Sequence, residues 1–268
     1  MCGKNYILFS EHQNNEDMIN LLLLQRKKYS FAKKISTIPF LLSVILIFIK
    51  SYSYYTTIFS IVFSIISFII IRISKNKVKN AATIQELFDT SLYKLPWNNI
   101  LVGEKPQVDY LENYKESKKK TLKNWYKIPE EYKNKNEIIL NCQCQNLKWD
   151  KNLNLLLFIS IILFFIVIWI ISIWRNYSLV SILIVFFPAL TQVISHIFNI
   201  LDIYTSENTL IKRINKLKEK EYSKTDLRQI QDYLFIIRCN TTMTPDLIYK
   251  IYYFLFMLIM QKIICIKY

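Results

Sequence analysis

A stripe of polar side chains runs through one of the apolar segments of the sequence, residues 177–201. Its members recur at spacings of three and four, which places them on one face of a helix. They are Gln192, Ser195 and Asn199, with His196 beside them. Amide, hydroxyl and imidazole groups are costly in an apolar environment, so they must face protein or water. The stripe therefore predicts either the lining of a pore or a seam of hydrogen bonds between packed helices.

Two arginines, Arg228 and Arg238, occur in a stretch that is otherwise apolar on one face. A guanidinium group in such a place needs a carboxylate or phosphate partner. We expect salt bridges to Glu86, Asp89 or Asp150. A pocket for an anion or a nucleotide is the alternative.

Conventional catalytic groups are sparse in this sequence. The two histidines, His12 and His196, lie far apart, and Cys142-x-Cys144 is the closest pair of thiols. These residues do not supply paired general bases or a metal-ligand set. With two glycines in 268 residues, glycine-rich phosphate-binding loops are excluded as well. We predict a protein that is not an enzyme and has no metal or cofactor.

The composition combines apolarity with positive charge. Hydrophobic residues make up 52% of the chain, and its formal net charge is +15. This combination is typical of a membrane protein with basic cytosolic parts. Five cysteines at irregular positions do not suggest a secreted disulfide framework and fit a reducing compartment.

Four apolar runs, residues 35–49, 57–73, 153–174 and 177–201, are candidate membrane spans. The last two are long enough to cross a hydrocarbon core of about 30 Å at about 1.5 Å per residue. The first two are shorter and need flanking Lys and Tyr residues at the interfaces. A buried core helix is the alternative for these shorter runs.

The distribution of charge predicts the orientation. Of the 35 Lys and Arg residues, all except Lys50 and Arg175 lie on one side of the membrane if the four runs are spans, with Arg72 at the inner end of the run 57–73. The positive-inside rule places those basic segments in the cytoplasm. We therefore expect a multi-pass protein of the bacterial inner membrane, with both termini cytoplasmic.

The resulting fold class is an all-α membrane protein with two transmembrane helical hairpins. A helical cytoplasmic domain is built from the central insert and the C-terminal tail, because apolar residues recur at helical spacing in both. The predicted divisions are a cytoplasmic N-terminal helix (1–34), hairpin 1 (35–73), the insert (74–151), hairpin 2 (152–201) and the tail (202–268). For residues 247–260 we favour a helix that is buried or lies at the inner interface, with a fifth span as the alternative.

Three segments outside the spans carry a family resemblance. The first is Ala82-Thr-Ile-Gln-Glu-Leu-Phe-Asp89, followed by Leu95-Pro-Trp-Asn98. The second is Asn124-Trp-Tyr126, followed by Cys142-Gln-x-x-Asn146 and Trp149-Asp150. The third is Leu227-Arg228, Gln231-Asp232 and Arg238, followed by Pro245-Asp246-x-x-Tyr249. Together they resemble the SMODS-associating four-transmembrane effector family of bacterial nucleotide-signalled, CBASS-like antiviral systems.

The resemblance implies a pore-forming or membrane-disrupting effector of abortive infection, triggered by a nucleotide signal such as a cyclic oligonucleotide. A non-pore membrane receptor or scaffold for a soluble signalling partner is the alternative. We expect a lipid bilayer and copies of the same chain as partners, and no binding of DNA or RNA. Anionic lipid headgroups would explain the basic surface as well as a nucleotide would.

The motif residues are candidates either for sensing the signal or for the core of the cytoplasmic domain. In the second role the tryptophans pack the core, while the amides and carboxylates satisfy buried polar groups and pair with the arginines. These candidates are Gln85, Glu86, Asp89, Trp97, Gln143, Trp149, Asp150, Arg228 and Arg238.

Overall fold

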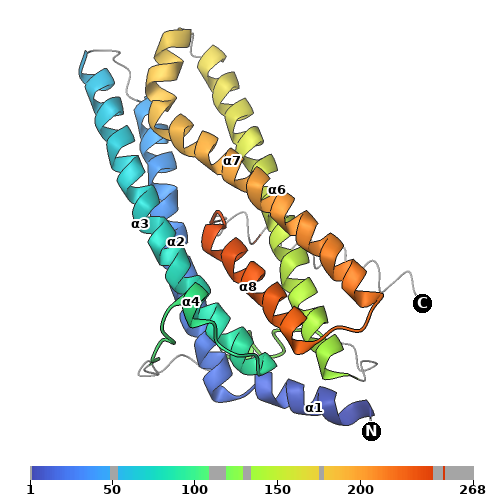
Figure 1. Ribbon diagram of the computed structural model, residues 1–268. Coiled ribbons are helices and arrows are strands. Elements are labelled where there is room, and N and C mark those ends of the chain that lie inside the picture. The colour runs from blue at the N-terminus through green and yellow to red at the C-terminus, as the bar shows by residue number, and fades with distance from the viewer. Residues whose placement is uncertain are drawn as a thin grey trace. The chain divides into compact units, whose positions relative to one another are not determined.

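The computed structural model describes residues 2–48, 54–108, 119–128, 134–174 and 178–243, together with residue 250. Within these ranges every regular element is a helix, which confirms the all-helical class for the described chain. Figure 1 shows α1 (Cys2–Gln13), α2 (Glu16–Phe48), α3 (Tyr54–Tyr93), α4 (Asn99–Val102), α6 (Lys135–Trp174), α7 (Leu179–Lys218) and α8 (Lys224–Asn240). Apart from Lys250, the segment 247–260 lies outside the described residues.

Four of the helices are long. Helix α2 has 33 residues, and α3, α6 and α7 have 40 each. At about 1.5 Å per residue, 40 residues extend about 60 Å, roughly twice the hydrocarbon core of a bilayer. One helix can therefore cross a membrane with one part and belong to an aqueous domain with the other.

Two stretches of the described chain, Ile58–Tyr93 and Lys135–Ile171, are helical and long and apolar enough to cross a membrane. They overlap the predicted spans 57–73 and 153–174 at residues 58–73 and 153–171. The predicted spans 35–49 and 177–201 fall on α2 and α7, which include many side chains outside the described set. A membrane crossing by these two segments, and the arrangement as two hairpins, stay predictions.

The chain divides into two compact units. The first, which we call the core unit, comprises Met1–Tyr29, Asn76–Asp150 and Ile203–Thr241. The second, the apolar unit, comprises Ser30–Lys75, Lys151–Asp202 and Thr242–Tyr268. Helices α2, α3, α6 and α7 each run from one unit into the other without a break, whereas α1, α4 and α8 belong to the core unit alone.

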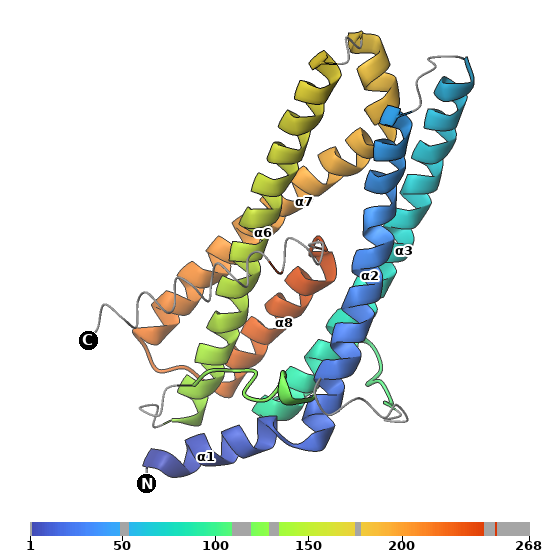
Figure 2. The same ribbon diagram turned by 180° about the vertical axis from the view of Figure 1, so that it is seen from behind.

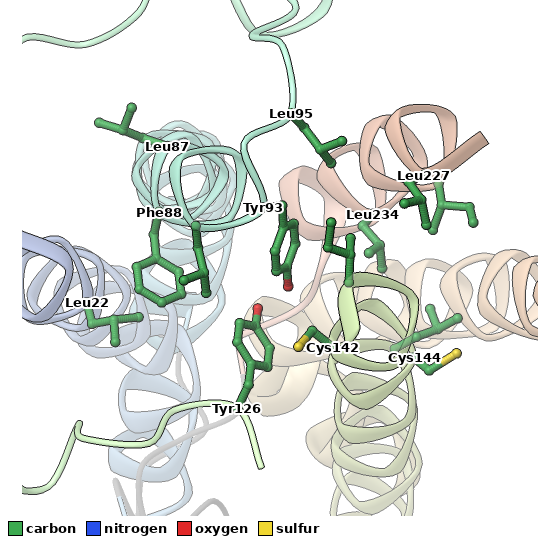
Figure 3. Packing of buried hydrophobic residues seen from close by; sticks show 14 of the residues in the cluster. Leu22, Leu87, Phe88, Tyr93, Leu95, Tyr126, Cys142, Cys144, Leu227 and Leu234 are labelled. Carbon is green, nitrogen blue, oxygen red and sulfur yellow. The ribbon is translucent and has the colours of Figure 1, made fainter. Parts of the chain in front are cut away.

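The core unit is held together by a hydrophobic cluster to which α1, α2, α3, α6, α7 and α8 all contribute. Phe88 of α3 and Leu234 of α8 are fully buried in it. Figure 3 shows Tyr93 and Tyr126 pointing toward one another beside Cys142, and their ring centroids lie 5.9 Å apart. The burial of this much aliphatic and aromatic surface is the main stabilising contribution to the unit.

Helix α8 begins at a well-formed cap. The Ser223 side chain accepts a hydrogen bond from the backbone N–H of Asp226, and the Asp226 carboxylate accepts from the Ser223 backbone N–H, which makes a capping box. One face of the helix is apolar and buried, yet the same face also carries Arg228, Gln231 and Arg238. These three polar side chains of α8 are thus directed into the interior of the core unit.

Amide side chains fix the segment 119–128 against the start of the chain. Gln13 donates to the carbonyl oxygen of Tyr126 and accepts from its backbone N–H, at 3.4 and 3.1 Å. The Asn14 amide donates to Asn124 Oδ1, and Asn14 Oδ1 accepts from the Asn124 backbone N–H, at 2.8 Å for both bonds. Asn124 has a positive φ of 54°, a conformation that asparagine tolerates better than most residues. These bonds place the Tyr126 ring in the core.

In the apolar unit, α2 and α3 lie side by side in both views (Figures 1 and 2). Ser60, Ser64 and Ser67 of α3 are buried. Ser64 and Ser67 donate to carbonyl oxygens four residues earlier, at 2.8 and 2.7 Å. Ser74 donates to the Ala32 carbonyl oxygen of α2 at 3.3 Å. These small residues form a packed seam.

Helices α6 and α7 share a smaller cluster in the apolar unit, formed by Leu157, Ile161, Val193 and Ile200. Elsewhere large apolar side chains lie on the surface, including Phe68 at 58% and Trp169 at 63% exposure. An apolar surface of this extent is typical of a protein that contacts lipid.

Candidate functional site

The polar residues of the three motif segments converge on one buried network in the core unit. Arg228 of α8 is at its first centre. Its Nη2 donates to Glu86 Oε1 of α3 at 2.6 Å, and its Nε donates to Asp232 Oδ1 at 3.1 Å. Its Nη1 donates to the Pro96 carbonyl oxygen at 3.1 Å. All three guanidinium nitrogens therefore have partners.

The Leu95-Pro-Trp-Asn98 turn is part of the same centre. The Asn98 amide donates to both carboxylate oxygens of Asp232 at 3.2 Å, and its Oδ1 caps α4 by accepting from the Leu101 N–H. The Trp97 indole donates to the Gly103 carbonyl oxygen at 2.9 Å, and the ring packs against the hydrophobic cluster. This turn thus fixes the end of α3 to the first turns of α8.

The network has a second centre around Arg238, which lies near the C-terminal end of α8. Its Nη1 donates to Asp89 Oδ2 at 2.7 Å, and both side chains are almost fully buried. The Tyr126 hydroxyl donates to Asp89 Oδ1 at 2.6 Å, and the Asn146 amide of α6 donates to the Tyr126 oxygen at 2.6 Å. Asp89 therefore joins α3, α6, α8 and the segment 119–128.

A pair of glutamines connects the two centres. The Gln231 amide donates to Glu86 Oε2 at 2.8 Å and to Asp89 Oδ2 at 3.2 Å. The Gln143 amide of α6 donates to Gln231 Oε1 at 3.1 Å and to the Leu227 carbonyl oxygen at 2.9 Å. All four of the side chains Glu86, Asp89, Gln143 and Gln231 are fully buried. Each of these four side chains is hydrogen-bonded within the network, although Gln143 Oε1 is buried without a partner within the described chain. Buried polar networks of this kind restrict the helices to few arrangements.

Gln85 connects α2 to α3. Its Oε1 accepts from the Gln25 amide at 2.9 Å and from the Tyr29 hydroxyl at 3.2 Å. Gln25 and Tyr29 were not predicted, because they stand among charged residues in the sequence. Their separation of four residues was the available signal, since it puts them on one helix face.

The buried environment of the network disfavours nucleophilic chemistry. Burial raises the pKa of the Cys142 thiol well above its usual value and does the same for the Tyr126 phenol. Both groups therefore stay protonated. Burial also raises the pKa of Glu86, against hydrogen bonding from Gln231 and the charge of Arg228. In the part of the chain that the structure describes, no group of three or more His, Cys, Asp and Glu residues could hold a metal ion.

Asp150 lies at the edge of this network, half-buried at the end of the core unit, and Trp149 beside it is also half-buried. Burial lowers the pKa of Arg238, but the negative charges of Asp89 and Asp150 outweigh it and raise that pKa. Within the described chain, Nε and Nη2 of Arg238 are buried without a hydrogen-bond partner. Asp150 thus adds negative charge near a guanidinium group that is incompletely bonded.

Asp150 makes the stability of the core unit depend on pH. Burial raises its pKa from 3.8 to about 6, with Arg238 opposing and Asp89 adding to the increase. Because the folded state holds this proton more tightly than the unfolded chain, stability falls as pH rises from about 4 to about 6 and stays lower above. We expect Asp150→Asn to remove this loss and to stabilise the unit at pH 7.5 by about 1 to 3 kcal/mol. Urea unfolding of the wild type and the variant at pH 4.5 and pH 7.5 would measure this difference in the free energy of unfolding.

Glu16→Gln is the control for that measurement. Glu16 is exposed, and its hydrogen bond with Lys119 lowers its pKa. Its contribution therefore has the opposite sign, being present at neutral pH and lost as the pH falls. Equal stability of Asp150→Asn and the wild type at pH 7.5 would contradict the assignment.

The predicted pore stripe lies on α7 in the apolar unit. His196 and Asn199 are half-buried, and the Asn199 amide donates to Thr242 Oγ1 at 2.9 Å. The side chains of Gln192 and Ser195 lie outside the described set. Whether the stripe lines a pore therefore stays a prediction.

The fold and the site define a class: an all-helical protein with long apolar helices and a core unit organised by buried ion pairs. The profile of the SMODS-associating 4TM effector domain matches residues 9–256, and the chain belongs to this family. The resemblance inferred from the three motif segments is thereby confirmed.

A relative described as a probable CBASS effector molecule of Bacillus cereus (strain VD146) is 26% identical to this chain. The alignment covers 89% of this chain and 91% of that protein. No solved structure matches the chain.

Proposed function

We propose that this protein is an inner-membrane effector of bacterial antiviral defence. It forms a pore or disrupts the membrane when its core unit receives a nucleotide-type signal. Membership of the effector family and the similarity to a CBASS effector support the role in defence. Two long apolar helices and the exposed apolar side chains support the location in a membrane. The proposal includes cytoplasmic termini and assembly into a homo-oligomer.

The observation that carries the proposal is the connection between the network and the apolar helices. Glu86 and Asp89 belong to α3, and Gln143 belongs to α6; all three are bonded to α8. Helices α3 and α6 continue without a break into the apolar unit. A signal that changes how α8 packs in the core unit would therefore act directly on helices that enter the bilayer. Networks of this kind have few alternative arrangements, as a two-state switch requires.

Leakage from liposomes tests the proposal. The purified protein is reconstituted with an entrapped dye, and cyclic di- and trinucleotides are added one at a time. We expect dye release with one nucleotide and none without it. If protein shown to be folded and inserted releases no dye with any nucleotide, the pore proposal is wrong, and a receptor or scaffold for a soluble partner becomes the better hypothesis.

Substitution of the polar stripe tests whether α7 lines the pore. We expect Gln192→Leu combined with Asn199→Leu to abolish leakage while leaving insertion and assembly unchanged, because an apolar lining does not hold water or ions. Phe198→Leu is the matched control, since Phe198 lies on the same helix and is 64% exposed. Normal leakage from the double variant would show that the stripe is only a packing seam.

A further inference from the structure

A cavity of about 480 Å³ lies in the core unit, apart from the buried network. It is formed by the first turns of α6, the end of α7 and the turn between α7 and α8. Leu140 contributes to its wall and is itself buried, while the other lining residues are polar. Its volume falls within the range of about 300 to 1,000 Å³ that is usual for small-molecule sites.

Two lysines, Lys218 and Lys220, supply positive charge to the cavity. Within the described chain, neither side-chain ammonium group has an ion pair or a hydrogen bond, although Glu137 and Glu221 line the same cavity. The cations are thus available to an anionic ligand, and phosphate oxygens are the groups that lysine ammonium commonly binds.

The surroundings of the cavity are also positive. Lys135 is the first residue of α6, next to the lining residue Asn134. Partial burial lowers its pKa, and the charges of Lys94 and Lys224 lower it further. Three lysines from α6, α8 and the end of α3 therefore share one electrostatic environment, which attracts anions to this end of the core unit.

The rest of the lining suits a flat, hydrogen-bonding group. Tyr222 lines the cavity and also packs against the hydrophobic cluster, so it offers an aromatic ring that is held by the core. Asn134 and Asn141 offer amides, and Glu137 offers a carboxylate. Aromatic rings stack on nucleobases, and carboxylates accept hydrogen bonds from the exocyclic amino groups of bases. A site for inorganic phosphate alone would have no use for these groups.

We propose that this cavity is a nucleotide site, in which Lys218 and Lys220 bind phosphate, Tyr222 stacks on a base, and Glu137 accepts from the amino group of that base. The inference rests on the proposed function, to which it adds a location and a preference for amino-bearing bases. Occupation of the cavity would join the start of α6 to the end of α7. Both of these helices continue into the apolar unit.

Binding of cyclic di-GMP, cyclic di-AMP, cyclic GMP-AMP and cyclic di-UMP to the full chain in a neutral detergent tests the proposal. We expect the wild type to bind at least one of the three amino-bearing probes. Lys218→Gln combined with Lys220→Gln should weaken this binding about tenfold or more. Lys212→Gln with Lys216→Gln is the matched control: it removes two exposed charges from the same helix outside the cavity, and should change binding by less than about twofold.

A second variant tests recognition of the base. Glu137→Gln should weaken binding of the amino-bearing probes while leaving any binding of cyclic di-UMP unchanged, and Glu219→Gln should change neither. Circular dichroism establishes that every variant is folded. These readouts separate a direct contact from a loss of structure, which would affect all the probes alike.

Three results of the binding experiments would overturn the inference. The first is equal loss of binding in the two lysine pairs, and the second is failure of the wild type to bind any of the four probes. The third is displacement of the bound nucleotide by short-chain phosphatidylglycerol at equal concentration, which would assign the cavity to a lipid headgroup. Nucleotide-triggered leakage that persists in the Lys218→Gln, Lys220→Gln variant would reject this location while leaving the proposed function intact.

Discussion

Asp89→Ala is expected to destabilise the core unit by about 3 to 5 kcal/mol, because it leaves the buried guanidinium of Arg238 without its counter-charge. The carboxylate of Asp89 accepts from Arg238 at 2.7 Å, from Tyr126 at 2.6 Å and from Gln231 at 3.2 Å. Removing it leaves the Arg238 Nη1 and Tyr126 hydroxyl donors without this acceptor, while the Gln231 amide keeps its bond to Glu86. Urea unfolding followed by tryptophan fluorescence would measure the loss.

Glu16→Ala is the matched control for this variant, since it also removes an acidic side chain that is bonded to a base. The Glu16–Lys119 ion pair has a similar length of 2.8 Å, but the Glu16 side chain is 74% exposed. Exposed pairs contribute little to stability. We expect no measurable change for Glu16→Ala, and comparable losses in the two variants would contradict the role assigned to burial.

Leu234→Ala is expected to destabilise the core unit by about 2 to 5 kcal/mol, through lost apolar burial and the cavity that is left. Leu234 is fully buried on the inner face of α8. Ile236 lies two residues further along the same helix and is 42% exposed. We expect Ile236→Ala to cost less than about 1 kcal/mol. Chemical unfolding of the two variants compares a buried and an exposed position on one helix, where the change in helix propensity is nearly equal. Similar losses of unfolding free energy in the two variants would show that α8 is not packed as described.

Helix locations and the types of the buried partners could be predicted because both depend on local pattern. Apolar spacing of three and four indicated helices in the insert and the tail, where α3 and α8 are found. An arginine in an apolar helix requires a counter-charge, which pointed to Glu86, Asp89 or Asp150 as partners of Arg228 and Arg238. The structure shows Glu86 and Asp89 in that role.

The pairing itself could not be predicted. Glu86, Asp89 and Asp150 were equally acceptable partners for either arginine, because the choice depends on how α8 is rotated and shifted against α3. The pairing of Gln143 with Gln231 could not be predicted for the same reason, since an amide can form a hydrogen bond with almost any neighbouring polar group. These contacts depend on tertiary packing, which a local sequence pattern does not determine.

The cavity at the start of α6 was missed for a related reason. Lys218 and Lys220 appeared in the sequence as part of an exposed basic run, for which a solvated face or a lipid contact is the ordinary explanation. Only the fold brings them beside Asn134, Glu137 and Asn141. The function of the predicted pore stripe, by contrast, stays a prediction until leakage is measured.

The order of the chain has a consequence for biosynthesis. Glu86 and Asp89 are made 142 and 149 residues before the arginines that neutralise them. At about 5 to 20 residues per second, the ribosome needs about 7 to 30 s to cover that interval, during which both apolar segments of the second half emerge. A nascent chain, or a product released before α8, lacks both arginines and does not complete the core unit. Translation itself thus delays completion of the core unit until Arg238 has been made.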